Sequence, residues 1–341
     1  MNQTWLDQLI SPGSGSELIG SASATTPANS VQFLERGDLA VVRIEGSDAA
    51  SFLQAQTCND HAEVTANTAQ LNGYCSPKGR LLALPIVAAG AGENTFYWLL
   101  SRDLVETVVK RLTMFVLRSD VSIQVEEDWV VVGLAAKTDQ LDESLEHWFG
   151  EAGAAELSSW SKKEHLAIKA RSVAGFSRSL LFGPAETIKT SLMECFEALP
   201  QGLDDPLWSD RASWYLGDIQ AGVPSIVAKT QDAFVPQMVN LEQVDGLSFT
   251  KGCYPGQEIV ARMQYLGKLK RTMVRFSSTE PAVAFAGDKL KAGDDENAGE
   301  VVNSVVVDGG MECLAVIKTS ADLATFSFNG AALSAQDLPY T

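Results

Sequence analysis

The order in which predicted strands and helices follow one another constrains the fold of this chain more than any other feature. From residue 39, apolar periodicity and turn residues indicate a strand, a helix, several further strands and a second helix. The predicted strands of this first unit cover 39–44, 68–75, 81–88 and 96–100. Its first predicted helix is capped at Ser47 or Asp48, carries Ala50, Phe52 and Leu53, and ends at residues 57–60, and its second covers 104–112. Such an order predicts an α+β unit with a mostly antiparallel sheet.

A similar pattern starts again at residue 121. Its predicted strands cover 121–125, 129–135, 164–171 and 179–182, and its predicted helices cover 141–149 and 185–198. A further helix carries Arg211, Trp214 and Ile219. Residues 272–341 lack helical periodicity and contain predicted strands over 272–276, 300–307 and 312–317. Because 341 residues exceed one ordinary core, we expect two α+β units followed by a small β-barrel.

Charge and composition narrow the function classes. The formal net charge is −17, which repels nucleic acid phosphates and anionic membrane surfaces over most of the molecule. The N-terminal sequence MNQTWLDQLI does not read as a secretory signal, and no apolar run is long enough to span a bilayer. We therefore expect a cytoplasmic protein with no membrane partner. Its folded part should follow a flexible segment over residues 1–30.

The five cysteines are scattered and show neither a C-x-x-C pair nor zinc-ligand spacing. Free thiols in a reducing cytoplasm are the natural interpretation, and we expect no metal site built by this chain alone. His61, His147 and His165 lie far from Cys253 in sequence and carry no motif, which argues against a Cys–His hydrolase.

Residues 250–275 contain a candidate reactive cysteine, Cys253, just before a predicted helix. Pro255 suits the first turn of a helix, and a good stop follows at Gly267. The apolar face of this predicted helix consists of Ile259, Val260, Met263 and Leu266. We therefore expect Cys253 to lie within two residues of a helix N-terminus, where partial positive charge favours a thiolate.

The same segment is locally basic. Residues 251–275 contain six basic residues and one acidic residue, a net charge of +5 within a strongly acidic chain. One interpretation is an anion-binding site that carries a thiol. The alternative is an ordinary turn before an amphipathic helix with a solvated basic face, and the residue chemistry leaves both open.

The run from Lys251 to Glu258, KGCYPGQE, resembles the K-G-C-Y-x-G-Q-E signature of the YgfZ-type folate-binding proteins, relatives of the glycine cleavage T-protein. Residues 219–224, 234–237 and 240–241 also look like this family, in the same order. Further upstream, Gln54 to Asp60 resembles its N-terminal segment. The resemblance covers roughly residues 35–275.

The resemblance implies a three-lobed T-protein-like fold. Two ferredoxin-like α+β lobes and a C-terminal β-barrel would surround a central channel that holds tetrahydrofolate. The first α+β domain would be split, with the second domain inserted between its two parts. The implied boundaries are 31–118 with 203–271 for the first domain, 119–202 for the second and 272–341 for the barrel.

The resemblance also implies roles for individual residues. Cys253 would be the essential thiol, with Lys251 beside it. The implied folate-binding residues are Trp214, Gln237, Asn240, Gln257, Glu258 and Arg262. An indole stacks well on a pterin or benzoyl ring, although core packing in a helix is the alternative for Trp214. A second family tryptophan is replaced here by Leu39.

The related T-proteins use an aspartate soon after the first hairpin, whereas residues 64–92 of this chain contain no acidic residue. The general acid or base of aminomethyl transfer therefore has no candidate there. The resemblance implies an accessory protein, and not a conventional enzyme. It would bind tetrahydrofolate and support iron–sulfur enzymes or their assembly, including methylthiolating enzymes that modify tRNA.

Two alternative functions remain open. One is a folate-dependent one-carbon transferase, and the other is a cofactor-free tRNA-binding module that uses the basic strip over 262–275. For the leading hypothesis we expect a monomer that meets tRNA only through modifying enzymes.

Overall fold

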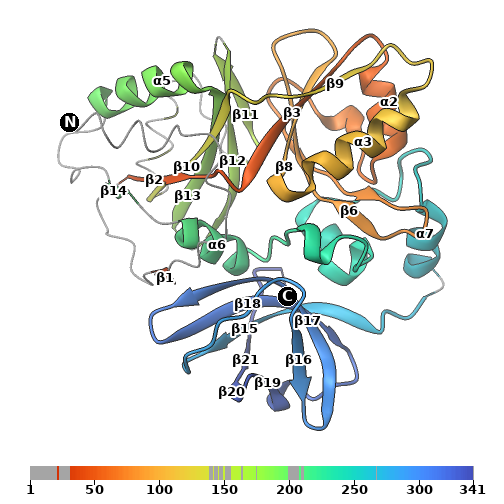
Figure 1. Ribbon diagram of the computed structural model, residues 1–341, viewed down its shortest axis with the longest axis vertical. Helices are drawn as coiled ribbons and strands as arrows, with labels where there is room; N and C mark the ends of the chain where they lie inside the picture. The colour runs from red at the N-terminus through yellow and green to blue at the C-terminus, as the bar shows by residue number, and fades with distance from the viewer. Residues whose placement is uncertain are drawn as a thin grey trace.

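The computed structural model describes residues 21–22, 31–137, 141, 145, 149, 155–162, 164–173, 175–198, 207–208, 211–265 and 267–340. Figure 1 shows two α+β lobes side by side above a C-terminal β lobe. Helix α6 (Arg211–Gln220) and the chain that follows it lie between the upper lobes and the β lobe.

The first lobe contains a five-stranded antiparallel sheet in the order β4-β7-β8-β3-β9. Its strands are β3 (Leu39–Glu45), β4 (Gln70–Leu71), β7 (Ile86–Ala89), β8 (Thr95–Ser101) and β9 (Ser122–Val125). A separate hairpin pairs β5 (Tyr74–Cys75) with β6 (Leu81–Ala83). The helices of this lobe are α2 (Ala49–Gln56), η1 (His61–Glu63), η2 (Arg102–Leu104) and α3 (Val105–Val116). Helix α3 buries Val105, Val108 and Leu112, the helical spacing expected from the sequence.

The second lobe contains a six-stranded sheet in the order β11-β12-β13-β10-β2-β14. Its elements are β2 (Gln32–Glu35), β10 (Trp129–Lys137), β11 (Ser159–Lys162), β12 (His165–Val173), β13 (Phe176–Pro184), α5 (Ala185–Ala198) and β14 (Leu207–Trp208). Strand β2 precedes β3 in the chain but pairs with β10, so the chain leaves the second sheet after β2 and crosses to the first at Arg36. Of the helix predicted over 141–149, only Leu141, Leu145 and Phe149 are among the described residues.

The C-terminal lobe is an eight-stranded sheet that closes into a barrel-like shape, in the order β20-β19-β16-β17-β18-β15-β21, with β1 beside β17. Its elements are β15 (Arg271–Ser278), β16 (Lys289–Ala292), β17 (Asp295–Val307), β18 (Gly310–Lys318), η6 (Leu323–Thr325), β19 (Phe326–Phe328), β20 (Ala331–Ala332) and β21 (Ser334–Gln336). Strand β1 (Ser21–Ala22) pairs in parallel with Val306 and Val307. The rest of the segment predicted as flexible, over residues 1–30, lies outside the described residues.

A connecting segment joins the three lobes. It contains η3 (Ala228–Thr230), η4 (Pro236–Val239), η5 (Leu241–Val244) and α7 (Gln257–Tyr265). One buried apolar cluster includes Phe234 from this segment, Ile219 from α6, Trp98 from the first sheet and Leu314 from the barrel. The α+β class with antiparallel sheets and a C-terminal barrel is therefore confirmed. No helix among the described residues is long and apolar enough to cross a membrane.

Candidate functional site

The loop that carries Cys253 is held to the first lobe by a buried lysine. The Nζ atom of Lys251 donates hydrogen bonds to the backbone carbonyl oxygens of Gln54 and Thr57, 2.5 Å from each, at the C-terminal end of α2. Lys251 is 7% exposed, and burial lowers its pKa to about 8. A cation at the carbonyl end of a helix is electrostatically favoured. The amine of Lys251 thus anchors this loop, residues 250–256, which we call the thiol loop.

The carbonyls that receive Lys251 belong to a rigid polar network. Gln54 donates from Nε2 to Asp60 Oδ1 at 2.9 Å and accepts from the backbone N–H of His61 at 2.7 Å. Asn59 Nδ2 donates to the backbone carbonyl oxygen of Asp245 at 2.6 Å, which ties the same turn to the segment before the thiol loop. The two family-like segments, 54–60 and 251–258, therefore form one structural unit.

Two glycines allow the thiol loop to contact the β5–β6 hairpin closely. Gly256 has a φ of +83°, and a Cβ added there would lie 2.3 Å from the carbonyl oxygen of Ser76 and 2.6 Å from Gly79 Cα. Gly79 also has a positive φ, of +68°. A side chain at Gly256 would therefore separate the loop from the hairpin turn.

Cys253 is exposed on the surface of this loop. Helix α7 begins at Gln257, and the carbonyl oxygen of Gly256 accepts from the N–H groups of Ile259 and Val260. Cys253 therefore lies four residues before the first helical residue, and the prediction of two residues was wrong. The physical reason is the turn over Tyr254–Gln257, which Gly256 closes with its positive φ, so Pro255 lies in this turn and not in the helix.

The predicted folate-binding residues fall in three separate places. Glu258 and Arg262 are exposed on α7, and Gln257 is half-buried at its start. Gln237 and Asn240 line a hollow of about 290 Å³ near the C-terminal end of α7. Both amides there already bond the backbone, Gln237 Nε2 to Val260 O at 2.7 Å and Asn240 Nδ2 to Met273 O at 3.0 Å.

Trp214, the sixth predicted residue, is packed in a core. It is 3% exposed, and the guanidinium carbons of Arg36 and Arg178 lie 5.0 and 4.7 Å from its ring centroid. Gly133 of β10 leaves space for the ring, since a Cβ there would lie 2.7 Å from the indole. Leu39, which replaces the second family tryptophan, packs against the same apolar cluster. This geometry matches the core-packing alternative for Trp214.

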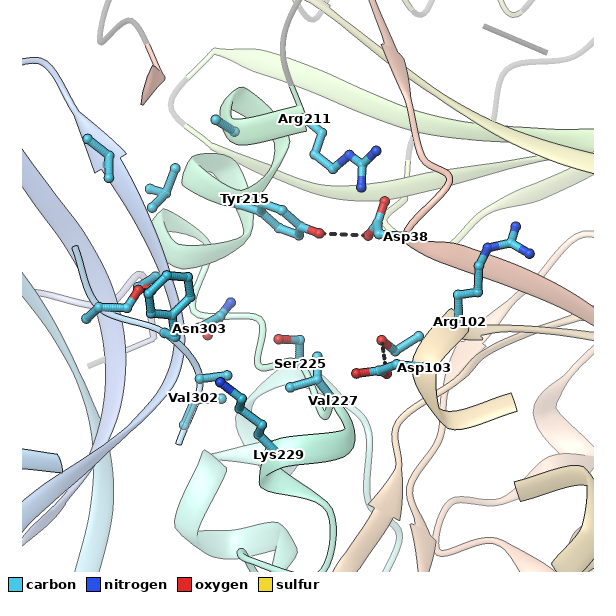
Figure 2. Close-up of a pocket in the computed structure, with 18 residues that line it drawn as sticks. Asp38, Arg102, Asp103, Arg211, Tyr215, Ser225, Val227, Lys229, Val302 and Asn303 are labelled. Carbon is cyan, nitrogen blue, oxygen red and sulfur yellow. Dashed lines mark hydrogen bonds between the residues drawn. The ribbon is translucent and has the colours of Figure 1, made fainter. Parts of the chain in front are cut away.

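A cavity with apolar and aromatic lining lies between the first lobe, α6 and the barrel (Figure 2). Its volume is about 420 Å³. The hydroxyl of Tyr215 donates to Asp38 Oδ2 at 3.0 Å, and Arg36 donates to both carboxylate oxygens of Asp38 at 2.9 and 2.8 Å. Burial opposes the charge of Asp38, but Arg36, Arg211 and Tyr215 together outweigh burial and hold the pKa of this carboxyl below its usual value. We call this cavity the α6 cleft.

Two polar groups of the α6 cleft have few partners. Lys229 Nζ lies 5.6 Å from the ring centroid of Phe285 and makes no ion pair with any described residue. Asn303 Oδ1 is buried and receives no hydrogen bond from the described chain. On the opposite wall, Asp103 accepts from the backbone N–H of Ala228 at 2.9 Å and from Ser101 Oγ at 2.7 Å.

The sequence reasoning missed every residue of the α6 cleft. Arg211 and Tyr215 are spaced i and i+4 around Trp214, so a helical wheel already places them together on one face. The reasoning also missed Asp232, whose carboxylate accepts from Ser76 Oγ at 2.7 Å at the hairpin turn. The β5–β6 hairpin contains no acidic residue of its own, but the carboxylate of Asp232, from a segment distant in sequence, is hydrogen-bonded to its turn.

We predict that replacing Gly256 with Ala lowers the free energy of unfolding by at least about 2 kcal/mol, because the added methyl meets backbone atoms and the positive φ is unfavourable for alanine. Gly252→Ala is the matched control in the same loop, since a Cβ there has no neighbour within 4 Å. Urea denaturation of both variants gives the measurement. Equal stability of the two would contradict the close contact.

We predict that His61 makes the protein sensitive to acid. Burial, together with the nearby charge of Lys251, lowers the pKa of His61 to about 4 from an ordinary value of 6.5. The unfolded chain then binds this proton more readily, so stability is lost as the pH falls from 6.5 to 4, by roughly 2–3 kcal/mol. In His61→Phe, urea midpoints measured across this range should depend less on pH. An unchanged pH dependence would show that His61 is not responsible.

The comparisons with known proteins agree with this architecture. No protein-family model matches the chain. It is 28% identical over 342 residues to a protein named tRNA-modifying protein YgfZ from Escherichia coli strain SE11, across 94% of this chain and 96% of the relative. It is 29% identical over 280 residues to the protein of the same name from Yersinia pestis strain Pestoides F, across 80% of each chain.

A solved structure shares the fold over most of the length. Glycine cleavage system aminomethyltransferase T from Bartonella henselae aligns with a TM-score of 0.69 at 13% identity, across 92% of this chain and 87% of that one. The resemblance seen in the thiol-loop motif is thereby confirmed: this chain is a homologue of proteins named tRNA-modifying protein YgfZ and has the fold of aminomethyltransferase T.

Proposed function

We propose that this chain is a tetrahydrofolate-binding accessory protein that supports iron–sulfur enzymes, including enzymes that methylthiolate tRNA, through the thiol of Cys253. One observation carries the proposal. The molecule has a ligand-sized cleft between its lobes and, away from that cleft, an exposed cysteine on a rigidly anchored loop. The names of its relatives and the fold of a glycine cleavage transferase support this function.

The α6 cleft fits the chemistry of a folate. Its volume of about 420 Å³ is in the range of small-molecule sites. Tyr215 and Phe285 offer aromatic surface for flat rings, and Lys229 offers a cation for the carboxylates of the glutamate moiety. Asn303 Oδ1 could accept a hydrogen bond from a ring N–H, which would satisfy a buried acceptor. Tetrahydrofolate, when bound, supplies a carrier for one-carbon units.

Cys253 is placed to serve a partner molecule. It is exposed and is not among the residues that line the α6 cleft. Lys251 fixes the loop from below through the carbonyls of α2, so the thiol faces outward on a backbone with little freedom. A thiolate is a good ligand for iron and a good nucleophile toward sulfur species. An iron–sulfur protein that contacts this loop would meet the thiol directly.

We predict that Lys229→Ala and Asn303→Leu each weaken tetrahydrofolate binding at least tenfold, because each removes a polar group of the α6 cleft. Isothermal titration with tetrahydrofolate measures the affinity. Lys268→Ala is the matched control, since this lysine is exposed and lies outside the cleft. If wild-type protein does not bind tetrahydrofolate, the cofactor assignment fails. If it binds but the two cleft variants match the control, the assigned cleft is wrong.

We predict that Cys253→Ala abolishes the support of a tRNA-methylthiolating enzyme while the melting temperature and the affinity for tetrahydrofolate stay unchanged. The exposed thiol makes no contact on which the fold depends. The measurement is methylthiolated nucleoside in tRNA from cells whose only copy of this protein is the variant. Thr250→Ala, on the same loop, is the control. Full methylthiolation with Cys253→Ala would remove the proposed role of the thiol.

A turnover assay addresses the alternative of a one-carbon transferase, which the T-protein fold favours. Asp232 is the one carboxylate that the described structure places on the hairpin turn, and Ser76 already binds it. Turnover of aminomethyl- or methylene-tetrahydrofolate by purified protein would favour that alternative, and its loss in Asp232→Asn would identify the acid.

A further inference from the structure

The exposed side of α7, next to the thiol loop, differs from the rest of the molecule in charge and in apolar exposure. Tyr265 is 69% exposed and Ile259 is 42% exposed, two of the few large apolar side chains that face solvent. Arg262 is also exposed and lies between them on the helix, at i+3 from Ile259 and i−3 from Tyr265. These three side chains therefore form one continuous strip.

Cations that form no ion pair with a described residue surround this strip. Lys268 and Lys270 follow α7, and Lys78 lies on the hairpin turn that Gly256 contacts. None of these lysines, nor Arg262, forms an ion pair with a described residue, and Glu258 is the one acid on the exposed side of α7. In a chain of net charge −17, most acids lie elsewhere. We call Lys78, Ile259, Arg262, Tyr265, Lys268 and Lys270 the α7 face.

We propose that the α7 face is the docking surface for the protein partner that uses Cys253, and that this partner presents an acidic surface around an apolar patch. The inference rests on the proposed function, because it names the kind of partner that the thiol serves. Interface hot spots are enriched in Tyr and Arg, with aliphatic neighbours that exclude water, and their lysines lie at the rim. The α7 face has this composition.

Charge complementarity selects the partner. The α7 face is positive within a negative molecule, so an acidic partner is attracted to this surface and repelled by most of the rest. An RNA would gain only four phosphate contacts from these cations against the field of the whole chain, and Ile259 would gain nothing from it. The geometry therefore favours a protein, with its interface directly beside the thiol.

Docking at this surface would place the partner's reactive site over Cys253. Gly252 has no side chain, and a Cβ at that position would have open space around it, so the approach to the thiol is not blocked on that side. Tyr265 is supported from below by Phe249, whose ring centroid lies 6.2 Å from that of Tyr265 in an edge-on arrangement. The strip is thus held in place before any partner arrives, which reduces the entropy lost on docking.

The experiment uses the full-length chain and, as the probe, a purified tRNA-methylthiolating iron–sulfur enzyme with its cluster reconstituted. Biolayer interferometry should show binding that weakens as salt rises from 0.05 to 0.2 M. The double variant Arg262→Glu/Tyr265→Ala should weaken it at least tenfold. Lys110→Glu/Met114→Ala, which changes an exposed lysine and an exposed methionine of α3 outside the α7 face, is the matched control and should bind like wild type.

The outcomes separate this inference from the proposed function. Cys253→Ala should dock like wild type yet fail to support methylthiolation. This result would show that docking depends on the α7 face and that methylthiolation depends on the thiol. Equal binding by wild type and the double variant, or no binding by wild type, overturns the α7 face as the docking site. If a tRNA probe binds in place of the enzyme and depends on Arg262, the partner class is wrong. A lowered melting temperature of the double variant would indicate misfolding, and single Tyr265→Ser then replaces it.

Discussion

The hydrogen bonds from Lys251 to the end of α2 are the interaction on which the thiol loop depends. They connect residues almost 200 positions apart in sequence and bring the connecting segment against the first lobe. A buried amine is costly unless its donors are used, and here two carbonyls that a helix end leaves unpaired supply the acceptors. Burial lowers the pKa of this lysine, yet the charged and the neutral amine can both donate, so the anchor persists in either state.

Close packing of the backbone against the β5–β6 hairpin also holds the thiol loop in place. Gly256 and Gly79 permit a contact between two main chains that no side chain would fit, and the turn over Tyr254–Gln257 follows from it. The loop is thereby held on two sides, by α2 and by the β5–β6 hairpin. With Lys251 facing inward, the exposed residues of the loop are Thr250, Gly252 and Cys253. The same constraint that fixes the loop therefore exposes the thiol.

The elements of the fold were predictable because they depend on local periodicity. The spacing in α3 and the strands of the barrel are visible within windows of ten residues. The start of α7 was displaced by two residues because Pro255 was given more weight than Pro-Gly as a turn signal, which the same residues contain. The inward direction of Lys251 could not be predicted, since it depends on α2, a partner distant in sequence.

The surroundings of Trp214 and the α6 cleft could not be predicted for the same reason, because both are built from residues that are distant in sequence. Trp214 lies on α6, a helix that the sequence predicts, but its surroundings could not be predicted, because the arginines that cover its ring come from β13 and from the chain before β3. The α6 cleft combines residues of the first lobe, α6, the 225–229 segment and the barrel. No single stretch of sequence contains enough of it to form a motif. Only its Arg211–Tyr215 pair has a local signal.

The separation of cleft and thiol determines how one could affect the other. Cys253 does not line the α6 cleft, so a bound ligand can act on the thiol only through the intervening backbone. A continuous path exists. Val227 and Lys229 of the cleft lead to Asp232 and Phe234, whose backbone groups exchange hydrogen bonds of 2.8 Å with Leu81 of the hairpin. The turn of that hairpin contacts Gly256. A ligand that binds one conformation of this path more tightly than another would favour the matching conformation of the thiol loop. By reciprocity, a partner that docks on that conformation of the loop would raise the affinity of the cleft for the ligand.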